Sequence, residues 1–214
     1  MESTLRAAAG APDLKLIETL GWDGTACARL DLHLARLARS ADVLGWSCKD
    51  AAAAVRMAAP AHPARIRLTL DRYGKIEVTV AALPKARPVW RICLASHTLT
   101  STDPWLTIKS TNRPAYDGAR ASLSPGFDEM IFQNERGEVC DGTITTVFFD
   151  GGDGLCTPPL TCGLLPGVLR AELLASGAVR EALLCAKNLD RVKLWVGNSL
   201  RGLIPAVFQG QVGA

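Results

Sequence analysis

The chain has 214 residues, of which 48% are hydrophobic and 21% charged, enough apolar material for one or two folded domains and too much for a disordered chain. Its net charge is only +3 and its basic residues are spread along the chain, so neither nucleic acid nor a membrane is an expected partner. No run approaches the roughly 18 apolar residues of a membrane span, and the N-terminus lacks the apolar region of a signal peptide.

Seven cysteines are present, none of them in a C-x-x-C pair, and most stand in apolar stretches such as that around Cys93. This usage is typical of reduced core residues, so we expect a cytoplasmic protein. The histidines His33, His62 and His97 are far apart and show no ligand spacing, so we expect no metal site.

The N-terminal part of the chain predicts a small α/β lobe over residues 1–82. Apolar residues recur three and four positions apart from Leu30 to Leu44, which predicts a helix that ends at Gly45. The other expected elements of this lobe are a strand at 14–20, an Ala-rich helix at 50–59, and a β-hairpin of strands 65–70 and 76–82.

Residues 83–88 hold two prolines and two cations and are the expected linker to a larger lobe over 89–214. In that lobe the segment GLLPGVLRAELLASG predicts a helix with Pro166 near its first turn and Gly177 at its end. The other expected elements are strands at 89–95, 127–133, 138–149 and 192–197 and a helix at 111–122. The pattern as a whole indicates an α+β protein with a strand-rich second lobe.

Four features could carry chemistry, although each has a commoner structural reading. Lys109 ends an apolar, strand-like stretch and is either an exposed strand-end lysine or a partly desolvated amine suited to Schiff-base chemistry. Asp141 lies in a β-branched run, where a carboxylate is costly unless it is paired, or it closes a turn. The helix start at 163–167 could hold a phosphate, while His33 and Arg36 could simply border a solvated helix edge.

Taken in order, six segments of the chain resemble the class IV (fold type IV) pyridoxal-phosphate enzymes, which include branched-chain and D-amino acid aminotransferases and aminodeoxychorismate lyase. The segments are LIETLGWDG, RLDLHLARLARSA, IKSTNRPAYDGAR, NERGEVCDGTITTVFF, LTCGLLPGVLR and GNSLRGLIP. The resemblance implies a small α/β lobe and a strand-rich pseudobarrel lobe with pyridoxal 5'-phosphate in the cleft between them, usually in a homodimer.

The resemblance also implies how the cofactor is held. Lys109 matches the lysine that bonds covalently to pyridoxal phosphate, and Arg36 matches the arginine that binds its phosphate. Gly167 and Val168 match the backbone N–H groups that hold the same phosphate.

Two matched positions depart from the usual family residues. Asp141 stands where the family usually has the Glu that pairs with the pyridinium nitrogen, and it is one methylene shorter. Thr146 stands where the family often has Asn. Asn198, Ser199 and Arg201 match the N-S-L-R-G loop near the phosphate and the substrate.

The segments around Lys109 and Asn198 look most like the aminodeoxychorismate lyase group, including the lyase-like domain fused behind aminodeoxychorismate synthase, which suggests a functional link to that synthase. The reaction converts 4-amino-4-deoxychorismate to 4-aminobenzoate and pyruvate in folate biosynthesis. Lys109 would be the base, Thr19 is a candidate acid by its position, and Arg113 and Arg201 could meet the two substrate carboxylates. The alternatives are an aminotransferase for branched-chain or D-amino acids and a degenerate, non-catalytic class IV domain.

Overall fold

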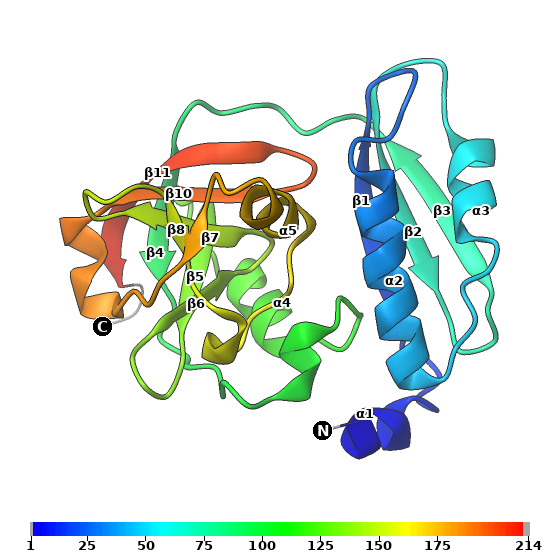
Figure 1. The fold of residues 1–214 in the computed structure, drawn as a ribbon, viewed down its shortest axis with the longest axis horizontal. Coiled ribbons are helices and arrows are strands. Elements are labelled where there is room, and N and C mark those ends of the chain that lie inside the picture. The colour runs from blue at the N-terminus through cyan, green and yellow to red at the C-terminus, as the bar shows by residue number, and fades with distance from the viewer. Residues whose placement is uncertain (1, 212–214) are drawn as a thin grey trace. The chain divides into compact units, whose positions relative to one another are not determined.

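The computed structural model describes residues 2–211 and groups them into two compact units (Figure 1). The first unit runs to Lys85 and also includes the separate segment Ile108–Asn112. The second unit consists of Ala86–Thr107 and the described chain from Arg113 onward. Within residues 2–211, no helix combines the length and the apolar character needed to cross a membrane.

The first unit is built on a three-stranded antiparallel sheet in the order β1-β2-β3, with α2 and α3 packed on it (Figure 1). Burial alternates along β2, so one face of this sheet forms a core with the helices. Helix α2 ends where predicted, at Gly45, whose φ of 74° is a left-handed conformation that favours glycine. The elements are α1 (Glu2–Ala8), β1 (Leu16–Trp22), α2 (Leu30–Leu44), α3 (Ala51–Ala58), β2 (Ala64–Leu70) and β3 (Ile76–Ala81).

A segment from the middle of the chain completes this unit. The backbone N–H of Ile17 donates to the carbonyl of Lys109 (2.8 Å), and the N–H of Thr111 donates to the carbonyl of Lys15 (2.9 Å). The sequence predicted that Lys109 and Thr111 belong to one continuous lobe over 89–214, and the structure corrects this prediction. Backbone pairing with a distant strand, rather than position along the chain, assigns the segment to the first unit.

In the second unit eight strands form a mixed sheet in the order β10-β11-β4-β5-β6-β7-β8-β9, and β10 also pairs with β7. This extra pairing closes the strands from β10 to β7 into a ring. The strands are β4 (Trp90–Leu94), β5 (Glu129–Gln133), β6 (Val139–Gly142), β7 (Thr146–Asp150), β8 (Cys156–Thr157), β9 (Arg180–Glu181), β10 (Lys193–Asn198) and β11 (Gly202–Gln211). The helices are α4 (Pro114–Ala121) and α5 (Val168–Ala175), with short 3-10 helices at Pro104–Thr107, Leu160–Cys162 and Ala186–Arg191. This architecture confirms the predicted α+β fold class.

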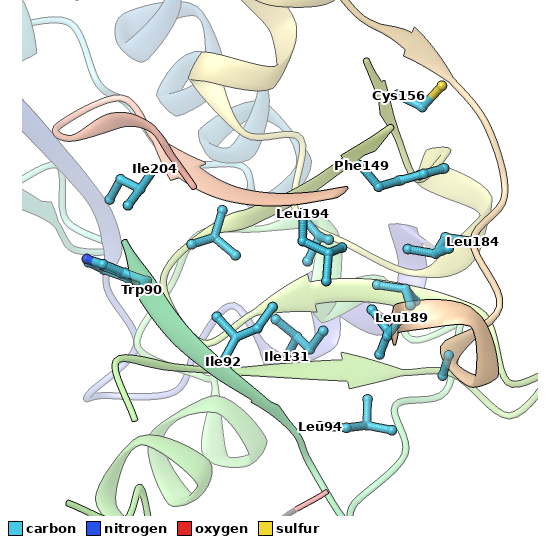
Figure 2. Close-up of a cluster of buried hydrophobic side chains, with 14 residues drawn as sticks. Trp90, Ile92, Leu94, Ile131, Phe149, Cys156, Leu184, Leu189, Leu194 and Ile204 are labelled. Carbon is cyan, nitrogen blue, oxygen red and sulfur yellow. The ribbon is translucent and has the colours of Figure 1, made fainter. Parts of the chain in front are cut away.

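One buried cluster takes residues from every strand of the ring (Figure 2). It includes Ile92 of β4, Ile131 of β5, Val139 of β6, Leu194 of β10 and Ile204 of β11. The neighbours of Ile131 along β5, Met130 and Phe132, belong to a second cluster on the other face. Because β5 is buried on both faces, its sequence EMIFQ is largely apolar instead of alternating.

The expected strand at 138–149 is in fact two strands, β6 and β7, joined by a tight turn in which the N–H of Gly142 donates to the carbonyl of Thr145 (2.7 Å). Strand β6 also carries a bulge, because Ile131 pairs with Gly142 while Gln133 pairs with Val139. A bulge reverses the side on which the next residues lie. Thus Val139 faces the core of the ring, whereas Asp141 pairs with Thr146 on the outer face.

Each helix of this unit has a proline or a glycine at its start, Pro114 as the first residue of α4 and Gly167 as the residue before α5. Helix α4 begins at Pro114, later than the expected residue 111, because proline fits the first helical position but not the interior. Helix α5 begins at Val168, so Pro166 stands two residues before the helix, near its first turn as predicted. Gly177 follows the end of α5 with a φ of 72°, as predicted for the residue that stops this helix.

Candidate functional site

The predicted site residues divide between the two units. The first unit holds Thr19, Arg36 and Lys109. The second unit holds Arg113, Asp141, Thr146, Gly167, Val168, Asn198, Ser199 and Arg201.

Arg36 lies in α2 and is buried, with 5% of its surface exposed. Its Nε donates to Oε1 of Glu18 (2.9 Å) and its Nη2 donates to Oε2 of the same carboxylate (2.6 Å). Nδ1 of His33, one helical turn before Arg36, lies 2.6 Å from Oε2 as well. Burial by itself would raise the pKa of Glu18, but the charge of Arg36 and the hydrogen bonds from both partners outweigh it and hold that pKa below its ordinary value.

This triad corrects the interpretation of His33 and Arg36 as a solvated helix edge, since both side chains are buried. Sequence reasoning missed Glu18 altogether. The available signal was a carboxylate inside the apolar segment LKLIETL, where a charge is costly unless it is paired.

Thr19 lies on β1, and Lys109 lies beside that strand. Residues Pro104–Thr107 form a 3-10 helix, so Lys109 does not end a strand as expected; it stands next to Ser110, which forms an isolated bridge with Leu16. Thr19 is half-buried and pairs with Arg67 of β2. Because side chains alternate along a strand, Thr19 lies on the opposite face of β1 from Glu18.

In the second unit, Asp141, Thr146 and Gly197 form a row across three paired strands, since Thr146 pairs with Asp141 on one side and with Gly197 on the other. Asp141 and Thr146 are each 5% exposed. Oδ2 of Asp141 accepts a hydrogen bond from the N–H of Leu165 (3.2 Å). The row therefore faces the segment that leads into α5.

Gly167 brings the start of α5 close to this row. A Cβ at position 167 would lie 2.7 Å from Oγ1 of Thr146, and one at Gly197 would lie 2.9 Å from the side chain of Leu169. Only glycine permits these approaches. The cap residue of α5, Gly167, has no side chain to accept a hydrogen bond from the first N–H groups of the helix, which include that of Val168 and point outward from the helix start.

Asn198 orders the turn that follows β10. Its Oδ1 accepts the N–H groups of Leu200 (3.1 Å) and Arg201 (3.0 Å), and its Nδ2 donates to the carbonyl of Ile144 (3.1 Å). Ser199 in this turn is 9% exposed. Through the hydrogen bond to Ile144, the turn after β10 is connected to the β6–β7 turn, which lies between Asp141 and Thr146.

The two candidate substrate arginines are held by aromatic rings. The guanidinium of Arg113 lies 5.1 Å from the ring centre of Tyr116, and its Nε donates to Asp117 (2.9 Å). The guanidinium of Arg201 lies 5.4 Å from the ring centre of Trp90. Stacking of this kind orients a guanidinium while its edge can still donate hydrogen bonds.

Tyr116 adds a buried hydroxyl to this group. Its ring meets that of Phe132 edge-on at 5.2 Å, and its Oη is buried without a hydrogen-bond partner among the described residues. Burial, and after it the charge of Asp141, raises the pKa of Tyr116 well above its ordinary value, so the phenol stays protonated and can donate.

The polar groups of the second unit fit a ligand that carries a phosphate and a basic ring nitrogen. An uncapped helix start with glycine at its entrance suits a phosphate, and a buried carboxylate beside it suits a protonated nitrogen. The unsatisfied Tyr116 hydroxyl requires a polar acceptor as well. Pyridoxal phosphate presents all of these features.

Comparison with known proteins agrees with this chemistry. A protein of Schizosaccharomyces pombe named "Putative aminodeoxychorismate lyase" is 32% identical over 183 residues, which cover 78% of this chain and 75% of that protein. The crystal structure of a "Putative amino-acid aminotransferase" from Mesorhizobium loti is 44% identical, with a TM-score of 0.85 over 92% of this chain and 100% of that one. A "hypothetical aminotransferase" from Mycobacterium tuberculosis in its PLP-bound form has the same fold, with 21% identity and a TM-score of 0.79 over 95% of this chain and 84% of that one.

The family model for amino-transferase class IV matches residues 15–207. That range holds both the Glu18–Arg36 pair and the Asp141–Thr146 row. The chain therefore belongs to the class IV aminotransferase family, whose members are pyridoxal-phosphate-dependent enzymes of fold type IV.

Proposed function

We propose that this chain is an aminodeoxychorismate lyase, which converts 4-amino-4-deoxychorismate to 4-aminobenzoate and pyruvate. The observation that carries the proposal is the 32% identity to the relative named as such a lyase, because the match extends over most of both chains. The arrangement of Arg113 and Arg201 is compatible with a substrate that carries two carboxylates, since each guanidinium is oriented by an aromatic ring.

In this proposal the phosphate of the cofactor is held by Arg36 and by the N–H groups of Gly167 and Val168, with Ser199 and Asn198 ordering the adjacent turn. Asp141 keeps the ring nitrogen protonated, and Thr146 supports it from the neighbouring strand. Bound pyridoxal phosphate supplies an electron sink for the charge that develops on the substrate.

Lys109 would hold the cofactor through a covalent bond to its Nζ, and the same amine would serve as the base that takes the ring proton of the substrate. Loss of this proton lets the ring aromatise as the enolpyruvyl group departs. The departing group needs a proton, and Thr19 is the candidate donor on the first unit. Two of the five N–H donors of Arg113 are used by Asp117 and by the carbonyl of Thr143, which leaves donors for a substrate carboxylate.

An amino-acid aminotransferase is the second candidate function. The 44% identity to the Mesorhizobium loti protein favours it, since that protein's name describes an aminotransferase. Such an enzyme would use the same cofactor residues and differ in the side chains that receive the substrate.

One experiment separates the two functions. The protein loaded with pyridoxal phosphate is incubated either with 4-amino-4-deoxychorismate or with a set of amino acids and 2-oxoglutarate. Equal amounts of 4-aminobenzoate and pyruvate support the lyase, whereas glutamate formation without 4-aminobenzoate supports the aminotransferase. Lys109→Ala is the control, because it should abolish either activity while leaving the rest of the site intact.

We also propose a homodimer located in the cytoplasm, linked in function to the synthase that makes aminodeoxychorismate. Light scattering of the purified chain tests the dimer. Release of 4-aminobenzoate from chorismate and glutamine, when synthase is added, tests the link.

A further inference from the structure

Glu129, at the start of β5, carries a carboxylate that is completely buried, with 0% of the residue exposed. Its Oε1 accepts the N–H groups of Met130 (3.0 Å) and Thr143 (3.1 Å) and the hydroxyl of Thr143. Its Oε2 accepts the N–H of Ile144 (3.1 Å) and the hydroxyl of Thr145 (2.8 Å). One carboxylate therefore binds all three residues of the β6–β7 turn.

The turn is shaped to receive this carboxylate. A Cβ at Gly142 would lie 2.5 Å from Oγ1 of Thr145 and 3.0 Å from Oε2 of Glu129. The glycine thus leaves the space that the carboxylate and the threonine hydroxyl occupy. Nη1 of Arg120, 3.5 Å from Oε1, offsets part of the cost of burying the charge.

The same turn holds two candidate site residues through its carbonyl groups. Nη2 of Arg113 donates to the carbonyl of Thr143, and Nδ2 of Asn198 donates to the carbonyl of Ile144 (3.1 Å). Close to the turn, Asp141 of β6 pairs with Thr146 of β7. Glu129 is therefore hydrogen-bonded directly to the turn, and the turn is hydrogen-bonded directly to Arg113 and to Asn198.

We propose that Glu129 is a positioning residue, which fixes the turn Thr143–Thr145 so that Arg113 and the Asn198 turn are presented together to the substrate and cofactor. The inference rests on the proposed function only for what Arg113 and Asn198 bind. The coupling between Glu129 and the two residues is a property of the second unit itself.

The coupling is tested first in the cofactor-free protein by hydrogen–deuterium exchange. Glu129→Gln keeps the size of the side chain but turns one acceptor into a donor, which cannot receive the amide N–H groups of the turn. We expect faster exchange at residues 142–146 and also at 199–201. The matched control is Glu138→Gln, at the residue just before β6, where the carboxylate accepts from Asn134 and Arg136. Exchange that rises only at 142–146 would overturn the coupling.

The functional consequence is tested on the loaded enzyme. Glu129→Gln should raise both the KM of the substrate and the dissociation constant of the cofactor about tenfold or more, whereas Glu138→Gln should change neither more than about twofold at a similar loss of Tm. A lowered Tm with both constants unchanged in Glu129→Gln would make Glu129 structural only.

A milder pair of variants serves if Glu129→Gln does not fold. Thr145→Ala removes one hydroxyl donor, and Thr145→Ser keeps it. We expect Thr145→Ala alone to show faster exchange at 199–201 and a raised cofactor dissociation constant, with rescue in Thr145→Ser. Equal behaviour of the two variants would refute the proposal. If no variant or wild type turns over the lyase substrate, the exchange pattern still decides the coupling, and only the proposed function fails.

Discussion

Glu18 and Arg36 form a buried ion pair with two parallel hydrogen bonds, although they lie on different elements, the strand β1 and the helix α2. The arginine expected to anchor a phosphate is thus also the partner of a carboxylate that cannot reach water. This dual role changes what a substitution at Arg36 should do.

Arg36→Ala should lower both cofactor affinity and stability. Loss of the charge-assisted phosphate contact should weaken cofactor binding by roughly 30- to 1000-fold. The charge of Glu18 left behind should cost about 3–5 kcal/mol of unfolding free energy. In the double variant Arg36→Ala/Glu18→Gln most of the stability should return while the affinity stays low. Denaturant titration and cofactor titration of the two variants measure the difference, and joint recovery of both quantities would show that Arg36 has no contact with the phosphate.

The depressed pKa of Glu18 predicts an acid-sensitive contribution to stability. Because its pKa is lower in the folded state than the unfolded value of 4.5, its contribution is complete above that pH and is lost as the pH falls through the lower folded value. Melting temperatures measured from pH 7 down to pH 3 should therefore fall more steeply with pH for the wild type than for Glu18→Gln. Parallel curves for the two proteins would mean that Glu18 titrates alike in both states.

Lys109 should be the residue that bonds to the cofactor. Protein mixed with pyridoxal phosphate and treated with borohydride should gain the mass of one reduced adduct on the peptide that contains Lys109. Lys109→Ala should lose both the adduct and turnover. A stable adduct on another lysine together with retained activity would refute the assignment.

Asp141→Asn should separate the charge of this side chain from its shape. Asparagine keeps an oxygen that can accept from the N–H of Leu165, so the fold and cofactor binding should be preserved. The single-turnover rate should fall strongly, because the ring nitrogen loses the carboxylate that keeps it protonated. Asp141→Glu should keep or raise the rate. Equal rates for the two variants would mean that Asp141 only closes the bulged end of β6.

Gly167→Ala should be disruptive for a reason of space alone, since Gly167 has an ordinary φ of −63°. The new Cβ would lie 2.7 Å from Oγ1 of Thr146, which should cost about 1–3 kcal/mol. Removing that oxygen in Gly167→Ala/Thr146→Ala should recover part of the loss. Thermal melts of the single and double variants test this, and strict additivity of the two changes would contradict the close approach.

The amino-acid sequence by itself determined the elements whose signals are local. The leucine spacing and Gly45 defined α2, and alternation on either side of Asp71–Lys75 defined the β2–β3 hairpin. The order of the six segments identified the family and hence the cofactor. These features depend on residues close together in the chain or on short motifs, so they can be recognised without three-dimensional information.

Only the tertiary structure decided how distant segments meet. Several contacts join residues that are distant in the chain. They are the pairing of Lys109 with Ile17, the closure of β10 on β7, and the hydrogen bonds by which carboxylates hold Arg36 and the β6–β7 turn. The bulge that turns Asp141 toward Thr146 depends on register with β5, which hydrophobic alternation within β6 does not encode. Glu18 and Glu129 look like misplaced charges in apolar strands until the fold supplies the donors that make their burial favourable.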